Sequence, residues 1–363
     1  MKRFLVTMVF VAMSLAAISA FAAETTFEGR IYSSWSMGLS EGYENLDGQV
    51  VDLKGWNEFS LDRSYVTVKS KLSDYTSLNI TTDLRKTSGY DGYAIVLKFG
   101  FADWKLNFAP DLVTLRLGLQ PTKYLEAMDS QMWNRRYILN SIGDLNGFLT
   151  TSDLGANLNF NLGEKAKYGW AGVSIFNGTK YNDLTENNKN KDLNFYVVAK
   201  PLVNSSDFKE SMLAAQFYTG TQNEVIDTTM EASDYKRQII SFGGNLAYKG
   251  MFNVGADIWM NTLGQGPDSS DMKQQAMSFF GALYLKDLVG EESPLRTIDL
   301  FGRYDMYDPN TDADNDGDNW MIFGVECMPI KGVAASVNYR SHGFQNENLD
   351  SENYLYLNTE FRF

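Results

Sequence analysis

The segment between positions 121 and 149 carries charges of both signs, as a selective aqueous passage requires. Its cations and carboxylates are Lys123, Arg135, Arg136, Glu126, Asp129 and Asp144. Opposite charges that face each other across a narrow opening set up a transverse field, and rings of charge set ion preference. The sequence predicts a pore constriction formed by Lys123, Glu126, Asp129, Arg135 and Arg136, with the Arg135–Arg136 pair at its centre. Asp144 is expected to lie opposite the cations, as are Glu126 and Asp129. The alternative is that the charges only solvate a wall and pair with one another.

A second set of carboxylates, Asp312, Asp314 and Asp316, recurs at every second position and leads to Gly317. Oxygen ligands at the first, third and fifth positions open a calcium-binding loop. The match to such a loop is incomplete, because its twelfth position is Phe323 instead of Glu and the flanking segments have the pattern of strands instead of helices. Two interpretations stay open for 312–318: a solvated loop, or a divalent cation (Ca²⁺) site that bridges lipopolysaccharide.

Residues for enzymatic chemistry are sparse. His342 is the single histidine and Cys327 the single cysteine. Ser341 directly precedes the histidine, and neighbouring residues of a strand point to opposite faces. No Gly-x-Ser-x-Gly elbow, zinc-type Cys/His set or Gly-rich nucleotide loop occurs in the sequence. We therefore expect no enzyme and no resident cofactor, with an outer-membrane hydrolase that uses His342 as a remote alternative.

The amino terminus has the pattern of a secretory signal peptide. Lys2 and Arg3 precede a short apolar run, and small residues precede a cleavage site near Ala22. Removal of residues 1–22 takes away two cations, so the formal charge of −13 becomes −15. A chain this acidic is not expected to bind nucleic acid. The remainder, 23–363, shows no linker and no other apolar stretch of the ~20 residues that a spanning helix needs.

The last ten residues, 354–363, alternate between apolar and polar side chains. Leu355, Leu357 and Phe361 share one face, whereas Asn358 and Glu360 share the other. About ten residues is also the length with which a tilted strand crosses a bilayer. A terminal strand that ends on phenylalanine resembles the signature of bacterial outer-membrane proteins, which implies recognition by the barrel-assembly machinery.

Similar alternation predicts sixteen strands in all. They are expected at 26–37, 58–71, 74–86, 92–108, 111–120, 150–162, 168–178, 191–201, 210–220, 235–249, 251–262, 273–286, 295–307, 318–329, 331–343 and 351–363. Most connections alternate between tight turns and longer loops, which is typical of outer-membrane barrels. The predicted fold is an all-β, antiparallel, up-and-down transmembrane β-barrel in the bacterial outer membrane.

The alternation also assigns lumen-facing residues, because a barrel wall turns its polar parity inward. The lining expected from charged residues comprises Arg85, Arg116, Arg303, Arg340 and Glu326. A barrel of about 16 strands is wide enough to leave an aqueous channel. The longest connection, 121–149, carries apolar residues and is expected to fold into this lumen; a surface loop that packs on itself is the alternative.

Several short stretches resemble the phosphate-selective porins O and P. Leu115–Thr122 is similar to the strand before the constriction loop of that family, and Ser152–Ala156 and Val173–Gly178 resemble its next two strands. Arg303–Asn310 resembles a late strand and its loop. The resemblance implies a sixteen-stranded channel that forms a homotrimer. Because no ladder of lumen arginines and no lysine-rich constriction is evident, phosphate selectivity is not carried over.

These features predict a porin: a water-filled channel through which small hydrophilic solutes or ions diffuse passively. A channel specific for an oxyanion or a sugar is the first alternative. A structural barrel with a plugged lumen is a further one.

Overall fold

The computed structural model describes residues 24–41, 43–44, 50–87, 90–181, 185–223, 231–290 and 292–363. The predicted signal peptide, 1–22, lies outside these residues. Within the described part of the chain, no helix is long and apolar enough to cross a membrane.

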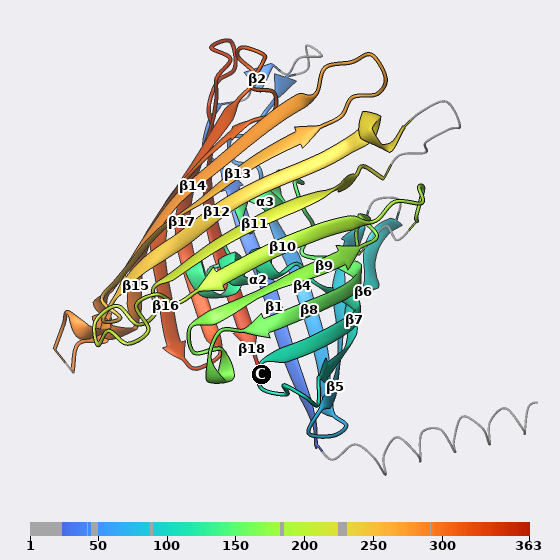
Figure 1. Ribbon diagram of the computed structural model, residues 1–363. Coiled ribbons are helices and arrows are strands. Elements are labelled where there is room, and N and C mark those ends of the chain that lie inside the picture. The colour runs from blue at the N-terminus through green and yellow to red at the C-terminus, as the bar shows by residue number, and fades with distance from the viewer. Residues whose placement is uncertain are drawn as a thin grey trace, which may run out of the picture.

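Sixteen antiparallel strands form one closed barrel (Figure 1). In chain order they are β1 (Glu24–Gly38), β4 (Asn57–Lys71), β5 (Thr76–Thr87), β6 (Tyr90–Lys105), β7 (Val113–Pro121), β8 (Ser152–Asn161), β9 (Gly169–Phe176), β10 (Asp192–Ala199), β11 (Met212–Thr221), β12 (Lys236–Tyr248), β13 (Phe252–Leu263), β14 (Met272–Tyr284), β15 (Ile298–Asp308), β16 (Asp318–Ile330), β17 (Val333–Phe344) and β18 (Glu352–Arg362). The barrel closes where β1 pairs with β18, so no strand edge is left open. The predicted fold and strand count are confirmed.

The two ends of the barrel differ. The tight turns, such as 72–75, 249–251 and 331–332, lie at the end that also holds the carboxyl terminus. The longer connections lie at the opposite end, where β2 (Tyr43–Glu44) and β3 (Val50–Val51) form a small separate hairpin (Figure 1). This asymmetry is the one that the strand pattern predicts.

Side-chain alternation gives the barrel an apolar outer surface. On β18, Leu357 and Phe361 are exposed on the outside, whereas Asn358 and Glu360 are buried on the inside. Exposed Phe, Leu, Ile and Val residues recur along the other strands as well. An outward apolar band with a polar interior matches a wall that separates lipid from water.

The connection between β7 and β8 lies inside the barrel and is called the inner segment (residues 122–151). It contains α2 (Lys123–Ala127), a π-helical turn (Met128–Met132) and α3 (Ile142–Leu145). Figure 1 shows α2 and α3 behind the front wall. Its apolar side chains pack on inward-facing residues of later strands, and this shared core includes Tyr124, Leu125, Met128, Trp133, Ile142, Phe148, Ile239, Trp259, Phe280 and Phe301.

Two glycines permit the inner segment to approach the wall. A Cβ on Gly143 would lie 2.3 Å from the ring of Trp259. A Cβ on Gly243 of β12 would lie 2.7 Å from the hydroxyl of Tyr124 and 2.8 Å from the sulfur of Met128. Since real side chains do not approach so closely, both positions must lack a Cβ for this packing to form. The half of the lumen next to these later strands is therefore filled.

Candidate pore site

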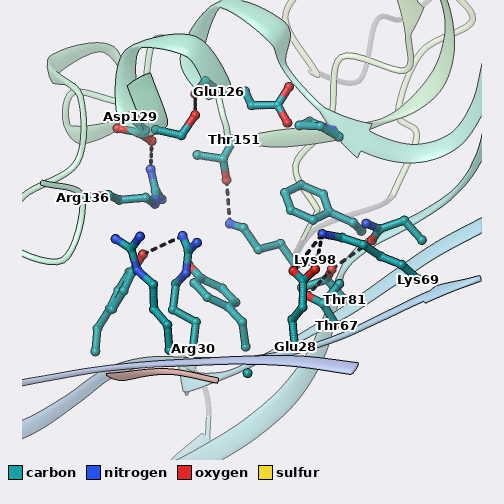
Figure 2. A pocket seen from close by; sticks show the side chains of 18 of the residues that line it. Glu28, Arg30, Thr67, Lys69, Thr81, Lys98, Glu126, Asp129, Arg136 and Thr151 are labelled. Atoms are coloured by element: carbon teal, nitrogen blue, oxygen red, sulfur yellow. Dashed lines mark hydrogen bonds and ion pairs between the residues drawn. The ribbon is translucent and has the colours of Figure 1, made fainter. Parts of the chain in front are cut away.

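The other half of the lumen keeps a cavity of about 840 Å³ between the inner segment and the wall made by β18, β1, β4, β5 and β6. Six cations and three carboxylates line it: Arg30, Lys69, Lys98, Arg136, Lys331, Arg362, Glu28, Glu126 and Asp129. Figure 2 shows the wall residues on one side and the inner segment on the other. A second cavity of about 340 Å³ adjoins it along β7 and β8 and shares Glu126 with it.

The wall supplies most of the cations. The Arg30 guanidinium of β1 lies 3.6 Å from the Glu360 carboxylate, and the Lys69 ammonium of β4 lies 2.6 Å from the Glu28 carboxylate. Lys98 of β6 donates to the hydroxyl of Thr151 at 2.8 Å (Figure 2). The pairs with Glu360 and Glu28 belong to the wall itself, so they stay in place without the inner segment.

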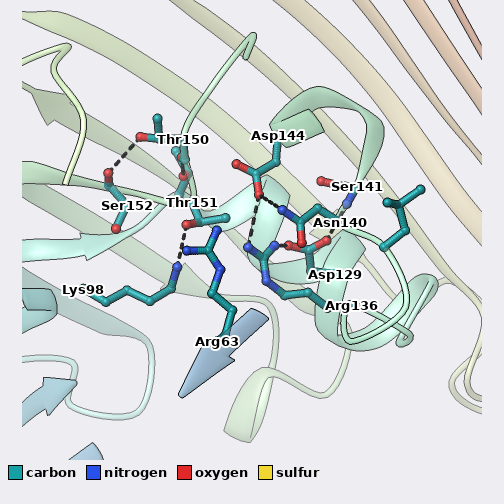
Figure 3. A network of polar contacts seen from close by, with 12 residues as sticks. Arg63, Lys98, Asp129, Arg136, Asn140, Ser141, Asp144, Thr150, Thr151 and Ser152 are labelled. Carbon is teal, nitrogen blue, oxygen red and sulfur yellow. Dashed lines mark hydrogen bonds and ion pairs between the residues drawn. The ribbon is translucent and has the colours of Figure 1, made fainter. Parts of the chain in front are cut away.

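The inner segment faces this wall with a network around Arg136. Asp129 accepts from the Arg136 guanidinium and, at 2.8 Å, from the backbone N–H of Ser141 (Figure 3). Arg136 also donates to Asp144 at 3.1 Å, and Asn140 donates to the same oxygen at 2.8 Å. Burial opposes the charged form, but Asp144, Tyr65 and Tyr32 together outweigh it, so the pKa of Arg136 is raised. The guanidinium therefore stays charged.

Two β-bulges turn additional charges inward. The pairing of β1 with β4 steps from Tyr32–Arg63 to Ser33–Leu61, and the pairing of β5 with β6 steps from Thr81–Phe99 to Thr82–Leu97. Each step leaves one extra residue, Asp62 in β4 and Lys98 in β6. A bulge re-aims side chains and changes the phase of the alternation. Lys98 and Phe99, although consecutive, consequently both line the large cavity.

A second connection also reaches into the lumen. Tyr181 follows β9 and is only 7% exposed. Its hydroxyl accepts from Arg85 at 2.5 Å and donates to Asp83 at 3.2 Å. The ammonium of Lys98 lies 4.6 Å from the centre of its ring. This connection thus places a side chain against Lys98, which lines the large cavity, although Tyr181 is not itself among the lining residues.

The predicted constriction residues divide into three groups. Arg136, Glu126 and Asp129 line the large cavity. Lys123 lines the adjoining cavity and lies 2.8 Å from the carboxylate of Glu126. Arg135 lines neither of these two cavities but a third one of about 340 Å³, together with Asp299 and Glu326. The two arginines therefore lie at different cavities, and the constriction itself stays a prediction.

Arg135 instead points into the opposite wall. Its guanidinium lies 2.8 Å from Glu326 and 3.7 Å from Asp299, and all three side chains are buried. Consecutive residues of an extended or turning segment project to different sides, so one arginine faces the passage and the other anchors the segment.

The predicted lumen residues face inward, but several of them hold the inner segment. Glu326 accepts from the hydroxyl of Tyr137 at 2.7 Å. Arg303 donates to the carbonyl of Asn140 at 2.7 Å, and Arg340 donates to the carbonyl of Ile138 at 2.9 Å. All three side chains are buried anchors. Glu326 also lines the cavity of about 340 Å³ that Arg135 lines, and a role of Arg303, Arg340 and Glu326 in lining a pore stays a prediction.

The two remaining predicted lining residues lie nearer the aqueous space. Arg116 pairs with Asp103 at 2.6 Å and lines the adjoining cavity. Arg85 contacts Tyr181 and does not line the large cavity. Arg30, Arg63, Lys98 and Tyr181 were missed. The alternation of β1 could have placed Arg30 on the inner face. The alternation of β6 could not have placed Lys98 there, because Lys98 lies at a bulge.

The acidic run 312–318 lies in the connection between β15 and β16 and reaches the first residue of β16. Residues 311–316 are all exposed, and Asp312 lies 3.8 Å from the ammonium of Lys273. Among the described residues, no group of three or more His, Cys, Asp or Glu side chains could hold a metal ion. Asn315, between Asp314 and Asp316, has a positive φ. The exposed connection favours the solvated loop, and a divalent-cation site at Asp312, Asp314 and Asp316 stays a prediction.

The described contacts of His342 are with aromatic rings and carboxylates. Its ring stacks on Trp320 at 4.1 Å between centroids and an interplanar angle of 8°. Its two nitrogens lie 3.6 Å from carboxylates of Asp318 and Glu352. No hydroxyl or thiol is among these contacts.

No protein-family model and no curated protein sequence matches the chain. Solved structures do match it over nearly its whole length. OmpT, an outer-membrane protein of Vibrio cholerae, has a TM-score of 0.61 at 12% identity and covers 93% of this chain and 97% of its own. The outer-membrane channel DcaP of Acinetobacter baumannii has a TM-score of 0.63 at 12% identity, with 94% and 97% covered.

The anion-selective porin from Comamonas acidovorans has a TM-score of 0.60 at 11% identity, with 94% of this chain and 99% of that chain covered. The fold is therefore that of the porin-type outer-membrane barrels. The neighbours support this general class, and they do not support the narrower resemblance to the phosphate-selective porins O and P.

Proposed function

We propose that the chain is a bacterial outer-membrane channel for passive diffusion of small hydrophilic solutes or ions. The observation that carries the proposal is the cavity of about 840 Å³, charged on both sides, within a closed barrel whose outside is apolar. Charged side chains that keep a wet space open inside a lipid-facing wall lower the barrier for polar solutes. A concentration gradient drives such transport, so no cofactor is required.

The test is electrical. Purified protein is inserted into planar lipid bilayers, and stepwise current is recorded in potassium chloride. Discrete conductance steps support the channel. No current at any voltage, from protein that is folded by circular dichroism, would falsify it.

A plugged structural barrel is the second candidate, and one observation favours it. The inner segment fills half of the lumen with a packed core, and Tyr181 spans part of the remainder. The same bilayer recording separates the two candidates, because a plugged barrel conducts no ions. A solute-specific channel would instead show saturable block of the current by one solute.

Several associated features belong to the proposal. Passage to the outer membrane requires cleavage of residues 1–22 and recognition of strand 354–363 by the barrel-assembly machinery. Contacts with lipid and lipopolysaccharide follow from the apolar outer band. A homotrimer, and membership of the phosphate-selective porin family, are supported here only by the short sequence resemblances.

A further inference from the structure

Tyr181 is surrounded by more positive than negative charge. Arg85 donates to its hydroxyl at 2.5 Å, and Arg63 does so at 3.5 Å. Lys98 lies over its ring at 4.6 Å. Among the described contacts of Tyr181 there is one carboxylate, that of Asp83, which lies 3.2 Å from the hydroxyl. The side chain of Tyr181 thus contacts three cations and one carboxylate.

Lys98 is the least compensated of these cations. It is 4% exposed, and among the described residues no carboxylate lies within 4.0 Å of its ammonium. Its polar partner is the hydroxyl of Thr151 at 2.8 Å, and aromatic rings of Tyr65 and Phe99 lie 5.3 and 5.5 Å away. Burial of an ammonium without a carboxylate in direct contact is costly. A counter-ion that visits this space would offset that cost.

The neighbouring cations add to the same field. Arg136 and Arg63 repel the Lys98 ammonium, whereas Asp83 and Asp144 attract it from beyond contact distance. Figure 3 shows Arg63, Lys98 and Arg136 reaching toward one space from the wall and from the inner segment. Arg136 is matched by Asp129 and Asp144, so the excess positive charge lies on the wall side. The Nε of Arg85 is a buried donor without a partner, and so is the hydroxyl of Tyr65.

Tyr181 is held firmly in this position. The backbone N–H of Gly178 donates to Asp153 at 2.9 Å, and the hydroxyl of Thr179 donates to the same carboxylate at 3.2 Å. Arg237 of β12 donates to the carbonyl of Gly178 at 3.0 Å. These contacts fix the chain just before Tyr181 to two strands of the wall, so the ring is held from its amino-terminal side beside Lys98.

We propose that Tyr181, with Arg63, Arg85 and Lys98 around it, is the filter of the passage and admits small inorganic anions such as chloride. The ring limits size, and the three cations set the sign of the permeant ion. This inference rests on the proposed channel function. It predicts an anion preference in a chain whose formal net charge is −13.

The experiment measures reversal potential and conductance of the full chain in planar bilayers under a potassium chloride gradient. The wild type should pass chloride in preference to potassium. In Lys98→Met that preference should fall about fourfold, the factor that one unit charge about 5 Å from an ion gives in water. Tyr181→Ala should conduct more and admit larger anions, whereas Tyr181→Phe keeps the ring and should retain the size limit.

Lys249→Met is the matched control, because Lys249 lies in an exposed turn and pairs with Asp207 at 3.2 Å. It should behave as the wild type. Unchanged selectivity in Lys98→Met together with unchanged conductance in Tyr181→Ala, in proteins with wild-type circular dichroism, overturns the filter alone. Absence of current from the wild type and every variant overturns the channel function and the filter together. Current in Tyr181→Ala but not in the wild type would mean that the ring closes the lumen; it overturns the channel function of the wild type, and the filter with it, in favour of the plugged barrel.

Discussion

Arg135 and Arg136 are adjacent in sequence but serve opposite sides of the inner segment. The guanidinium of Arg135 lies 2.8 Å from Glu326 in the wall, whereas that of Arg136 lies 3.1 Å from Asp144 beside the passage. One arginine therefore fixes the segment in the barrel, and its neighbour shapes the field that a solute meets.

Replacement of Arg135 by methionine should loosen the inner segment. The change leaves Glu326 and Asp299 buried without their cation, and a broken buried pair costs about 3–5 kcal/mol. Urea unfolding in lipid vesicles, followed by tryptophan fluorescence, should show this loss, and conductance should become noisier. The double variant Arg135→Met/Glu326→Gln should recover part of the stability. A single variant as stable as the wild type would contradict the anchoring role.

Replacement of Arg136 by glutamine should increase the permeation of cations relative to anions. Asp129 and Asp144 lose their counter-charge, and both face or flank the large cavity. The potassium-to-chloride permeability ratio should rise roughly two- to fivefold, as expected for a unit charge removed close to the ion path. Lys209→Gln changes the same charge at an exposed site and serves as the control. Equal shifts in both variants would mean that net charge alone sets the ratio.

Replacement of Gly143 by alanine should displace α3 from the wall. The added Cβ would meet the Trp259 ring at 2.3 Å, and overpacking of this kind costs about 1–3 kcal/mol. We expect a lower urea midpoint and an altered tryptophan emission spectrum. The control is Gly290→Ala, because a Cβ at that turn has nothing within 4 Å. Identical midpoints for the two variants would show that α3 does not pack as described.

Replacement of Leu357 by arginine tests which face of β18 meets lipid. Leu357 is exposed on the outside, opposite Val337 and Trp35 in the neighbouring strands. A cation on the lipid face near mid-membrane costs about 2–4 kcal/mol. Refolding yield and urea midpoint in vesicles should both fall, and Leu357→Ala should lose much less. Full stability of the arginine variant would place this side chain in water.

The strands were predictable because a transmembrane barrel repeats one simple rule. Alternation along 318–329 or 351–363 marks both the strand and its two faces, and the observed β16 and β18 agree with it within a few residues. The inward parity also identified Arg303 and Arg340 correctly as interior residues. Strand parity gives direction, but it cannot say whether an interior side chain meets water or another segment.

The site was harder to predict for two physical reasons. The bulges at Asp62 and Lys98 shift the alternation by one residue, and they depend on how neighbouring strands pair rather than on local sequence. Tyr181 comes from a connection with no strand pattern, so its contact with Arg85 across about a hundred residues of chain has no periodic signal. The direction of Arg135 is likewise decided by Glu326, which lies far along the chain.

The core inside the barrel also dictates an order of assembly. The hydrogen bond from Tyr137 to Glu326 joins residues 189 positions apart, and that from Arg340 to Ile138 joins residues 202 positions apart. Contacts this distant in sequence form late, because the intervening chain must first be ordered. The inner segment emerges early in synthesis, yet two of its anchors, Glu326 and Arg340, belong to strands near the carboxyl terminus. We therefore expect this side of the inner segment to dock on the wall only after β16 and β17 have joined the barrel.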